Sequence, residues 1–179
     1  MPSNFLEQLV AEWYEYQEYF VKRNVHVGRR AKGGYDCELD VVAFNPSKPH
    51  LIHIEPSMAA HSWAKREELF GKKFEAGRKH IRSLFPGLKV PTKIDQVALL
   101  EYASTCNHTE IAGGKILLVS DLLKQILEEL KGKDVAKEAV RENLSLIRCL
   151  QFVASHRAKL CGVLAARGSP DGRGTIPRG

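Results

Sequence analysis

Residues 33–58 read GGYDCELDVVAFNPSKPHLIHIEPSM, and this stretch decides the fold. Its first apolar run, residues 39–44, is rich in β-branched side chains, and a second apolar run covers residues 51–54. Between the two runs, residues 45–49 (NPSKP) combine asparagine, serine and proline, which favour a turn. We therefore predict two consecutive strands joined by a short turn.

Each of these predicted strands carries an acidic residue where a buried strand would not favour one. Asp40 lies near the start of the first strand, and Glu55 directly follows the second. On adjacent strands of one sheet, the two carboxylates can converge. Two convergent carboxylates are the minimum that holds Mg²⁺, a hard cation that prefers oxygen ligands and keeps some water for phosphate chemistry. The pattern indicates a candidate site for Mg²⁺ or Mn²⁺.

Hydrophobic periodicity outside this stretch predicts further helices and strands. Apolar residues at helical spacing predict helices over residues 4–21, 61–83, 120–130 and 135–160. Apolar runs bounded by turn residues predict strands over residues 25–27, 94–102 and 115–119. This order of elements favours an α/β sheet covered by helices.

The length and composition indicate one ordinary globular domain. A chain of 179 residues can form one good core but is short for two, so we predict a single domain over residues 1–166 and a disordered Gly/Pro-rich tail over residues 167–179. No apolar run approaches the ~20 residues that span a bilayer. The four cysteines lie far apart with no CxxC pair, which together with the lack of a signal-type N-terminus predicts a cytoplasmic protein with reduced thiols.

The charge balance suits a polyanionic partner. The net charge is +6 and the isoelectric point is about 9.2, which is typical of proteins that bind nucleic acid. Basic side chains in the turn at residues 28–34 and in the predicted helix at residues 61–83 are candidates for contacting phosphates; they are Arg29, Arg30, Lys32, Lys65, Arg66 and Lys72. A basic protein without such a partner stays open as the alternative.

The sequence resembles the PD-(D/E)xK nuclease superfamily, which has the restriction-endonuclease-like fold. Residues 34–42, GYDCELDVV, are similar to the family's strand that bears a metal-binding aspartate, with Asp40 in the ligand position. Residues 52–57, IHIEPS, are similar to its (D/E)-x-K triplet, with Glu55 as the second ligand. Glu7 stands upstream of residues 18–24 (EYFVKRN) much as the family's helix acid stands upstream of its Arg-Asn segment.

The resemblance implies a fold, an activity and a set of site residues. The fold would have a mixed central β-sheet flanked by helices, with the core order α-β-β-β-α-β. The activity would be metal-dependent hydrolysis of phosphodiester bonds in nucleic acid, with DNA as the expected substrate. Mg²⁺ or Mn²⁺ would be held by Glu7, Asp40 and Glu55. If Glu7 is only a helix cap, Glu12 is its substitute. Nucleases of this fold often act as homodimers, because a duplex offers two strands.

One departure from the family pattern bears on activity. Ser57 stands where the family has its lysine, which orients the attacking water and stabilises developing negative charge. Lys73 and Arg66, beside the apolar stripe of the predicted helix at residues 61–83, are candidates for a relocated cation. Lys73 is preferred as the catalytic cation because its amine can exchange a proton, whereas arginine stays charged. A degraded member that binds DNA or a protein partner without cleavage is the alternative.

Overall fold

The computed structural model describes residues 5–103 and 108–165. Its strands are β1 (Phe20–Arg29), β2 (Tyr35–Asn45), β3 (His50–Ser57), β4 (Asp95–Leu100), β5 (Glu110–Ile111) and β6 (Gly114–Leu118). Its helices are α1 (Phe5–Tyr16), α2 (Trp63–His80), the 3-10 helix η1 (Ile81–Leu84), α3 (Val119–Leu130), α4 (Ser145–Ser155) and α5 (Arg157–Ala165).

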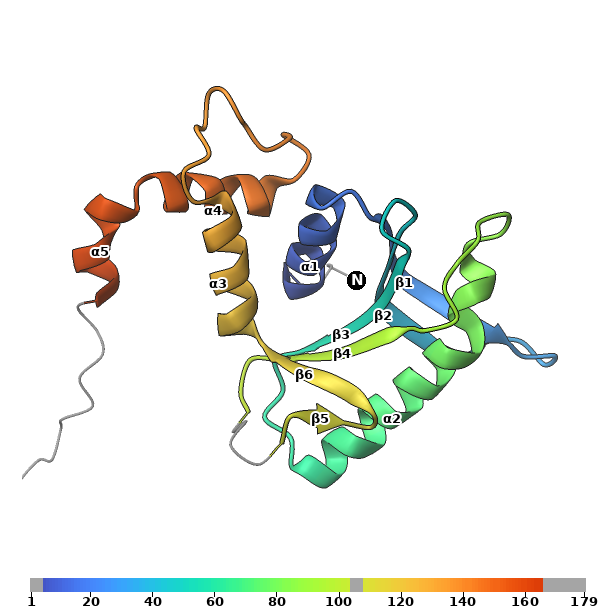
Figure 1. Ribbon diagram of the computed structural model, residues 1–179. Helices are drawn as coiled ribbons and strands as arrows, with labels where there is room; N and C mark the ends of the chain where they lie inside the picture. Colours follow the sequence, from blue (N-terminus) through green and yellow to red (C-terminus); the bar gives the residue numbers. More distant parts are fainter. Residues whose placement is uncertain (1–4, 104–107, 166–179) are drawn as a thin grey trace, which may run out of the picture.

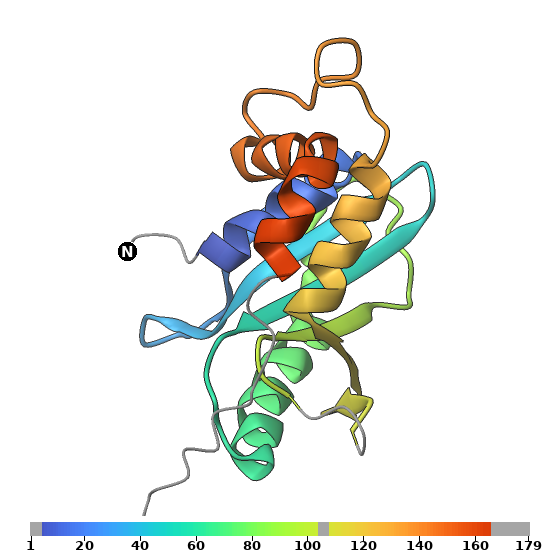
Figure 2. The same cartoon turned by 90° about the vertical axis from the view of Figure 1, so that its left-hand side faces the viewer.

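A six-stranded mixed sheet lies between two layers of helices (Figure 1). The strand order is β1-β2-β3-β4-β6-β5; β1, β2 and β3 pair antiparallel, whereas β3, β4 and β6 pair parallel. Helices α1, α3 and α4 cover one face, and α2 covers the other (Figure 2). The expected mixed sheet flanked by helices and the core order α-β-β-β-α-β are therefore confirmed.

Alternation along β3 sends side chains to both faces of the sheet. Ile52 and Ile54 join the large core beneath α1, α3 and α4. Leu51 packs into a smaller core on the other face, beneath α2 and η1. His53 and Glu55 point to this second face as well, and both are buried. Two charged or polar side chains therefore interrupt the apolar packing under α2.

The N-terminal helix is shorter than predicted and the strand after it is longer. Helix α1 ends at Tyr16, and Glu18 adopts a left-handed backbone (φ 65°) that turns the chain into β1 at Phe20. Phe20 is 58% exposed and begins β1, so the predicted end of the first helix at residue 21 was wrong. The predicted strand at residues 25–27 is the middle of a ten-residue strand that pairs with β2 along its length.

The C-terminal prediction was also wrong at its start. Residues 135–144 form no α-helix, and α4 begins only at Ser145. Val140 and Leu144 are nevertheless buried, which explains why an irregular segment resembled a helix in sequence. The short strand β5 was not predicted, and the tail at residues 167–179 lies outside the described residues. Within the described part of the chain, no helix is both long and apolar enough to cross a membrane.

Candidate active site

Asp40 and Glu55 lie side by side on neighbouring strands. The antiparallel register of β2 and β3 pairs Val41 with Ile54, which places the two acids at the next position along the ladder. The backbone N–H of Asp40 donates to Glu55 Oε1 at 3.1 Å. The structure thus brings together the two carboxylates that the strand pattern places in register.

Lys73 reaches this pair from α2. Its Nζ donates to Asp40 Oδ1 at 2.6 Å and also to Glu55 Oε2. The neighbouring helical residues Phe70 and Phe74 are buried against the sheet, which fixes the side of α2 from which Lys73 extends. One ammonium group therefore bridges two carboxylates that come from two other elements.

The three side chains line a cavity of about 330 Å³ between the sheet and α2. Ser57 lines the same cavity, and its hydroxyl accepts a hydrogen bond from the Ala59 backbone N–H at 3.3 Å. The wall combines the acid pair with basic, thiol and apolar side chains; it comprises Asp36, Cys37, Asp40, Glu55, Pro56, Ser57, His61, Arg66, Leu69, Phe70, Lys72 and Lys73. Positive charge at the acid pair is supplied by Lys73 and not from position 57.

Two buried polar residues extend the cluster beneath Glu55, and sequence reasoning did not assign them a role. His53 Nε2 lies 2.6 Å from Glu55 Oε1. Gln96 Nε2, on β4, lies 3.2 Å from His53 Nδ1. The spacing of two residues between His53 and Glu55 was a usable signal, because it places both on one face of a strand. No local pattern marks Gln96.

Burial and mutual charge shift the pKa values of the cluster. Burial, together with the neighbouring Glu55, raises the pKa of Asp40 to about 7. Burial also raises the pKa of Glu55, while hydrogen bonds from Asp40 and Lys73 oppose the rise. For Lys73, burial favours the neutral amine, but the two carboxylates outweigh it and raise its pKa. Burial, then the charge of Lys73, lowers the pKa of His53 to about 3, so its imidazole is neutral at pH 7.

The expected three-acid metal set is not assembled. Glu7 lies on α1, which covers the face of the sheet opposite to Asp40 and Glu55 (Figure 1). Among the residues that the structure describes, no group of three or more His, Cys, Asp or Glu side chains is arranged to hold a metal ion. The carboxylates that lie side by side at the cavity are those of Asp40 and Glu55, whereas Asp36, which also lines it, pairs with Arg30 at 2.8 Å.

Those two carboxylates fit a magnesium ion, which binds through few protein oxygens and keeps several waters. Burial first, and then the neighbouring Glu55, raises the pKa of Asp40, and a divalent cation would favour the charged form of both acids. His53 and the Asp40 backbone occupy Glu55 Oε1 and leave Oε2 toward Lys73. The Lys73 ammonium contacts Asp40 Oδ1 and Glu55 Oε2, so a bound ion would compete with this group for those two oxygens.

Glu12, the substitute considered for Glu7, has a structural role. It is 5% exposed, and its Oε2 accepts the backbone N–H groups of Leu146 and Ile147 at 2.7 and 3.2 Å. Ser145 Oγ lies 3.4 Å from the other oxygen. Glu12 therefore caps the N-terminus of α4, where a negative charge is favourable, and does not serve the cavity.

Arg66 is likewise a structural residue, which corrects both of its expected roles. The side chain is 6% exposed, and its Nη2 donates to the backbone oxygens of Ala59 and Tyr102 at 3.2 and 2.6 Å. Its guanidinium carbon lies 5.2 Å from the centre of the Trp63 ring. These contacts tie the start of α2 to two neighbouring loops, so Arg66 is not a free cation for a phosphate or for the acid pair.

The other basic candidates lie on the surface in two places. Arg29, Arg30 and Lys32 belong to the end of β1 and the tip of the β1–β2 hairpin, and all three are exposed. Arg30 Nε pairs there with Asp36 at 2.8 Å.

Lys65 and Lys72 are exposed on α2 and share one acid. Their ammonium groups lie 2.9 and 2.7 Å from the two oxygens of Glu68. Lys72 also lines the cavity, whereas Lys65 does not.

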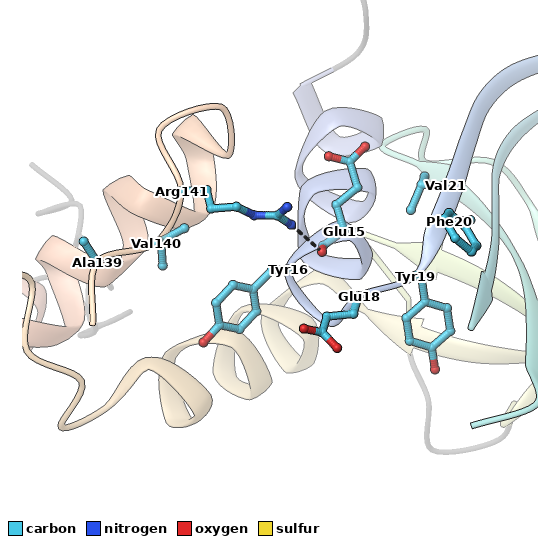
Figure 3. Close-up of a pocket in the computed structure, with 9 residues that line it drawn as sticks. All are labelled: Glu15, Tyr16, Glu18, Tyr19, Phe20, Val21, Ala139, Val140 and Arg141. Carbon is cyan, nitrogen blue, oxygen red and sulfur yellow. Dashed lines mark hydrogen bonds between the residues drawn. The ribbon is translucent and has the colours of Figure 1, made fainter. Parts of the chain in front are cut away.

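A larger hollow, of about 750 Å³, lies at the corner between α1, β1 and the segment before α4 (Figure 3). Arg141 donates from Nη2 to the backbone oxygen of Glu15 at 3.0 Å and closes one side. Figure 3 shows the carboxylates of Glu15 and Glu18 pointing away from each other. The hollow therefore has volume without convergent polar groups, and the smaller cavity under α2 is the better candidate.

Comparisons with known proteins name no family. No protein-family model matches the chain, and no curated protein matches it. A solved structure described as a protein of unknown function, AF1548, is similar, with 15% identity and a TM-score of 0.46. The likeness covers 87% of this chain and 97% of that one.

Proposed function

We propose that this protein is a divalent-metal-dependent nuclease of the PD-(D/E)xK type on a restriction-endonuclease-like fold, acting on phosphodiester bonds of DNA. The observation that carries the proposal is the position of Lys73. Its ammonium contacts both Asp40 and Glu55 in the cavity that Ser57 also lines. A cation from α2 thus stands where the triplet lysine is missing.

The chain's own residues divide the work. Asp40 and Glu55 would hold Mg²⁺, which when bound lowers the pKa of a coordinated water and neutralises charge on the scissile phosphate. Lys73, once displaced from the carboxylates, keeps its ammonium within the same cavity and can donate to the attacking water or to a phosphate oxygen. Lys72 on the rim and the basic hairpin tip would contact neighbouring phosphates.

Cleavage assays with Mg²⁺ or Mn²⁺ on single-stranded, duplex and junction DNA and on RNA test this function. Asp40→Ala and Lys73→Met should each abolish or strongly reduce cleavage. Lys124→Met is the matched control, because Lys124 is an exposed lysine on α3, on the other face of the sheet. Full metal-dependent cleavage by Asp40→Ala would contradict the proposal.

A second candidate function is binding of DNA, or of a protein partner, without cleavage. It is favoured by the limited donor set, since two carboxylates already paired with one lysine form a locally satisfied cluster. A preparation that is inactive with every divalent ion, yet binds DNA with an affinity that falls steeply with salt, would support it. Absence of DNA binding at low salt would argue against both cleavage and binding of DNA and would leave only the protein partner.

A further inference from the structure

We propose that His53 is a positioning residue for Glu55, held by Gln96 in the tautomer that carries its proton on Nε2. This inference rests on the proposed function for its effect on catalysis, while its structural content stands by itself. His53, Glu55 and Gln96 are 0, 1 and 7% exposed, so every polar atom among them must find its partner within the protein.

The orientation of the Gln96 amide is fixed from two sides. Arg78 Nη1 donates to Gln96 Oε1 at 2.6 Å, and a guanidinium can only donate. Gln96 Nε2 donates to the backbone oxygen of Phe74 at 2.8 Å, and a carbonyl can only accept. Both contacts identify the same atom as the amide nitrogen, so this atom also faces His53.

The fixed amide selects the tautomer of His53. Gln96 Nε2 lies 3.2 Å from His53 Nδ1 and carries only protons, so Nδ1 must accept. In a neutral imidazole the proton then sits on Nε2. Nε2 lies 2.6 Å from Glu55 Oε1 and therefore donates to that carboxylate oxygen.

A glycine in α2 makes room for this arrangement. A Cβ atom at position 77 would lie 2.5 Å from His53 Nδ1 and 3.1 Å from Gln96 Nε2. Gly77 is thus the residue that lets the helix backbone approach the imidazole and the amide together. The chain Arg78–Gln96–His53–Glu55 runs from the C-terminal half of α2 through β4 to the acid on β3.

The hydrogen-bonded series Arg78–Gln96–His53–Glu55 determines which oxygen of Glu55 faces the cavity. Two N–H donors, from His53 and from the Asp40 backbone, converge on Glu55 Oε1. They fix the plane of the carboxylate and leave Oε2 as the oxygen that meets Lys73 or a metal ion. Buried partners of metal-binding groups typically change metal affinity or activity about 10–100-fold when they are removed.

Nitrogen NMR of histidine-labelled, metal-free protein measures the tautomer directly, and the spectrum of His53→Gln assigns the signal among the seven histidines. We expect a protonated Nε2 and an unprotonated Nδ1 for His53. A protonated Nδ1 would overturn the inference. This readout does not depend on cleavage. A wild-type protein without nuclease activity would overturn the proposed function, whereas the tautomer of His53 alone decides the inference made here.

Kinetics of paired variants separate positioning from packing. His53→Leu should lower kcat about 10–100-fold with KM nearly unchanged, whereas His53→Gln, whose amide N–H can replace Nε2–H, should retain most of kcat. Equal losses in both variants would overturn the positioning role. Gln96→Leu should also lower kcat, while its control Gln151→Leu, which removes a buried amide that bonds the backbone of Val140 and Glu138, should change stability alone.

Discussion

Two buried glutamates, one on each face of the sheet, show how burial serves different ends. Glu12 is 5% exposed under α4, and Glu55 is 1% exposed under α2. Glu12 meets the N-terminal backbone N–H groups of a helix, together with hydrogen bonds from Gln8 and Ser145. Glu55 meets a second acid, a lysine, a neutral histidine and a cavity of about 330 Å³.

The contrast lies in what could change around each carboxylate. Two of the donors to Glu12 are backbone N–H groups at the start of α4, and Glu12 is not among the residues that line the cavity under α2. Glu55 instead pairs with the Lys73 side chain, which is 31% exposed at the cavity wall and which a metal ion would displace under the proposed function. A buried acid therefore indicates chemistry only where its counter-charge can be exchanged.

The largest expected effect separates the two acids by activity. Glu55→Gln should lower metal-dependent cleavage on the order of 10³-fold, because a neutral amide replaces the charge at the proposed metal site. The amide oxygen can still accept from His53 and Asp40, so the fold should persist. Glu12→Gln should cleave normally per folded molecule, and a comparable loss in both variants would erase the distinction.

The next largest expected effect distinguishes Glu12 from Glu55 by the free energy of unfolding. Glu12→Gln should lower the free energy of unfolding by about 2–3 kcal/mol, because the added NH₂ group faces hydrogen-bond donors at the start of α4 and the helix loses a favourable charge. Urea unfolding followed by circular dichroism measures the change. Wild-type stability in this variant would show that the cap contributes nothing.

Two glycines of α2 sharpen the contrast within one helix. Gly77→Ala should destabilise by about 2 kcal/mol and reduce cleavage, because the added Cβ would strike His53. Gly71→Ala should stabilise by about 0.5–1 kcal/mol, because its nearest neighbour, the Cβ of Ala112, lies 3.8 Å away. Thermal melts of both variants measure the two changes in stability. Equal shifts in melting temperature would show that the contact with His53 is not the cause of the loss in Gly77→Ala.

A further expected effect is a dependence of stability on pH in the presence of a chelator. The folded pKa of Asp40 is about 7, against 3.8 ordinarily, so the folded state holds this proton more tightly. As pH rises from 4 to 7, wild-type stability should fall relative to Asp40→Asn by about 1 kcal/mol per pH unit. The lowered pKa of His53 gives the opposite slope in both proteins, and Asp40 is one of the charges that act on His53, so the difference between the two curves reports on Asp40 together with the groups coupled to it. Parallel stability curves would contradict the shift.

The local parts of the site could be predicted from the sequence. Asp40 and Glu55 stand at the ends of two apolar runs joined by a turn rich in proline, which determines antiparallel pairing and brings the acids together. Lys73 stands beside the apolar stripe of a helix that must pack on the sheet. In each case a short-range pattern decides where the side chain lies.

The parts that depend on distant pairing could not be predicted. Gln96 lies 43 residues from His53, and only the parallel pairing of β3 with β4 makes the two residues neighbours. The roles of Glu12 and Arg66 likewise come from contacts with segments that are remote in sequence. No periodicity within any one element records such partners, and both residues therefore seemed available for function.

The ammonium group of Lys73 serves as a built-in counter-ion for Asp40 and Glu55. The acid pair has a counter-charge from within the chain, so under the proposed function folding would not require metal, unlike domains whose acids or thiols keep them unfolded without an ion. The same bridge sets a threshold, because an incoming cation must compete with a tethered ammonium group for Asp40 Oδ1 and Glu55 Oε2. Under the proposed function, the resting enzyme is insulated from trace metal and responds only when the supply of divalent ions is high enough to win that competition.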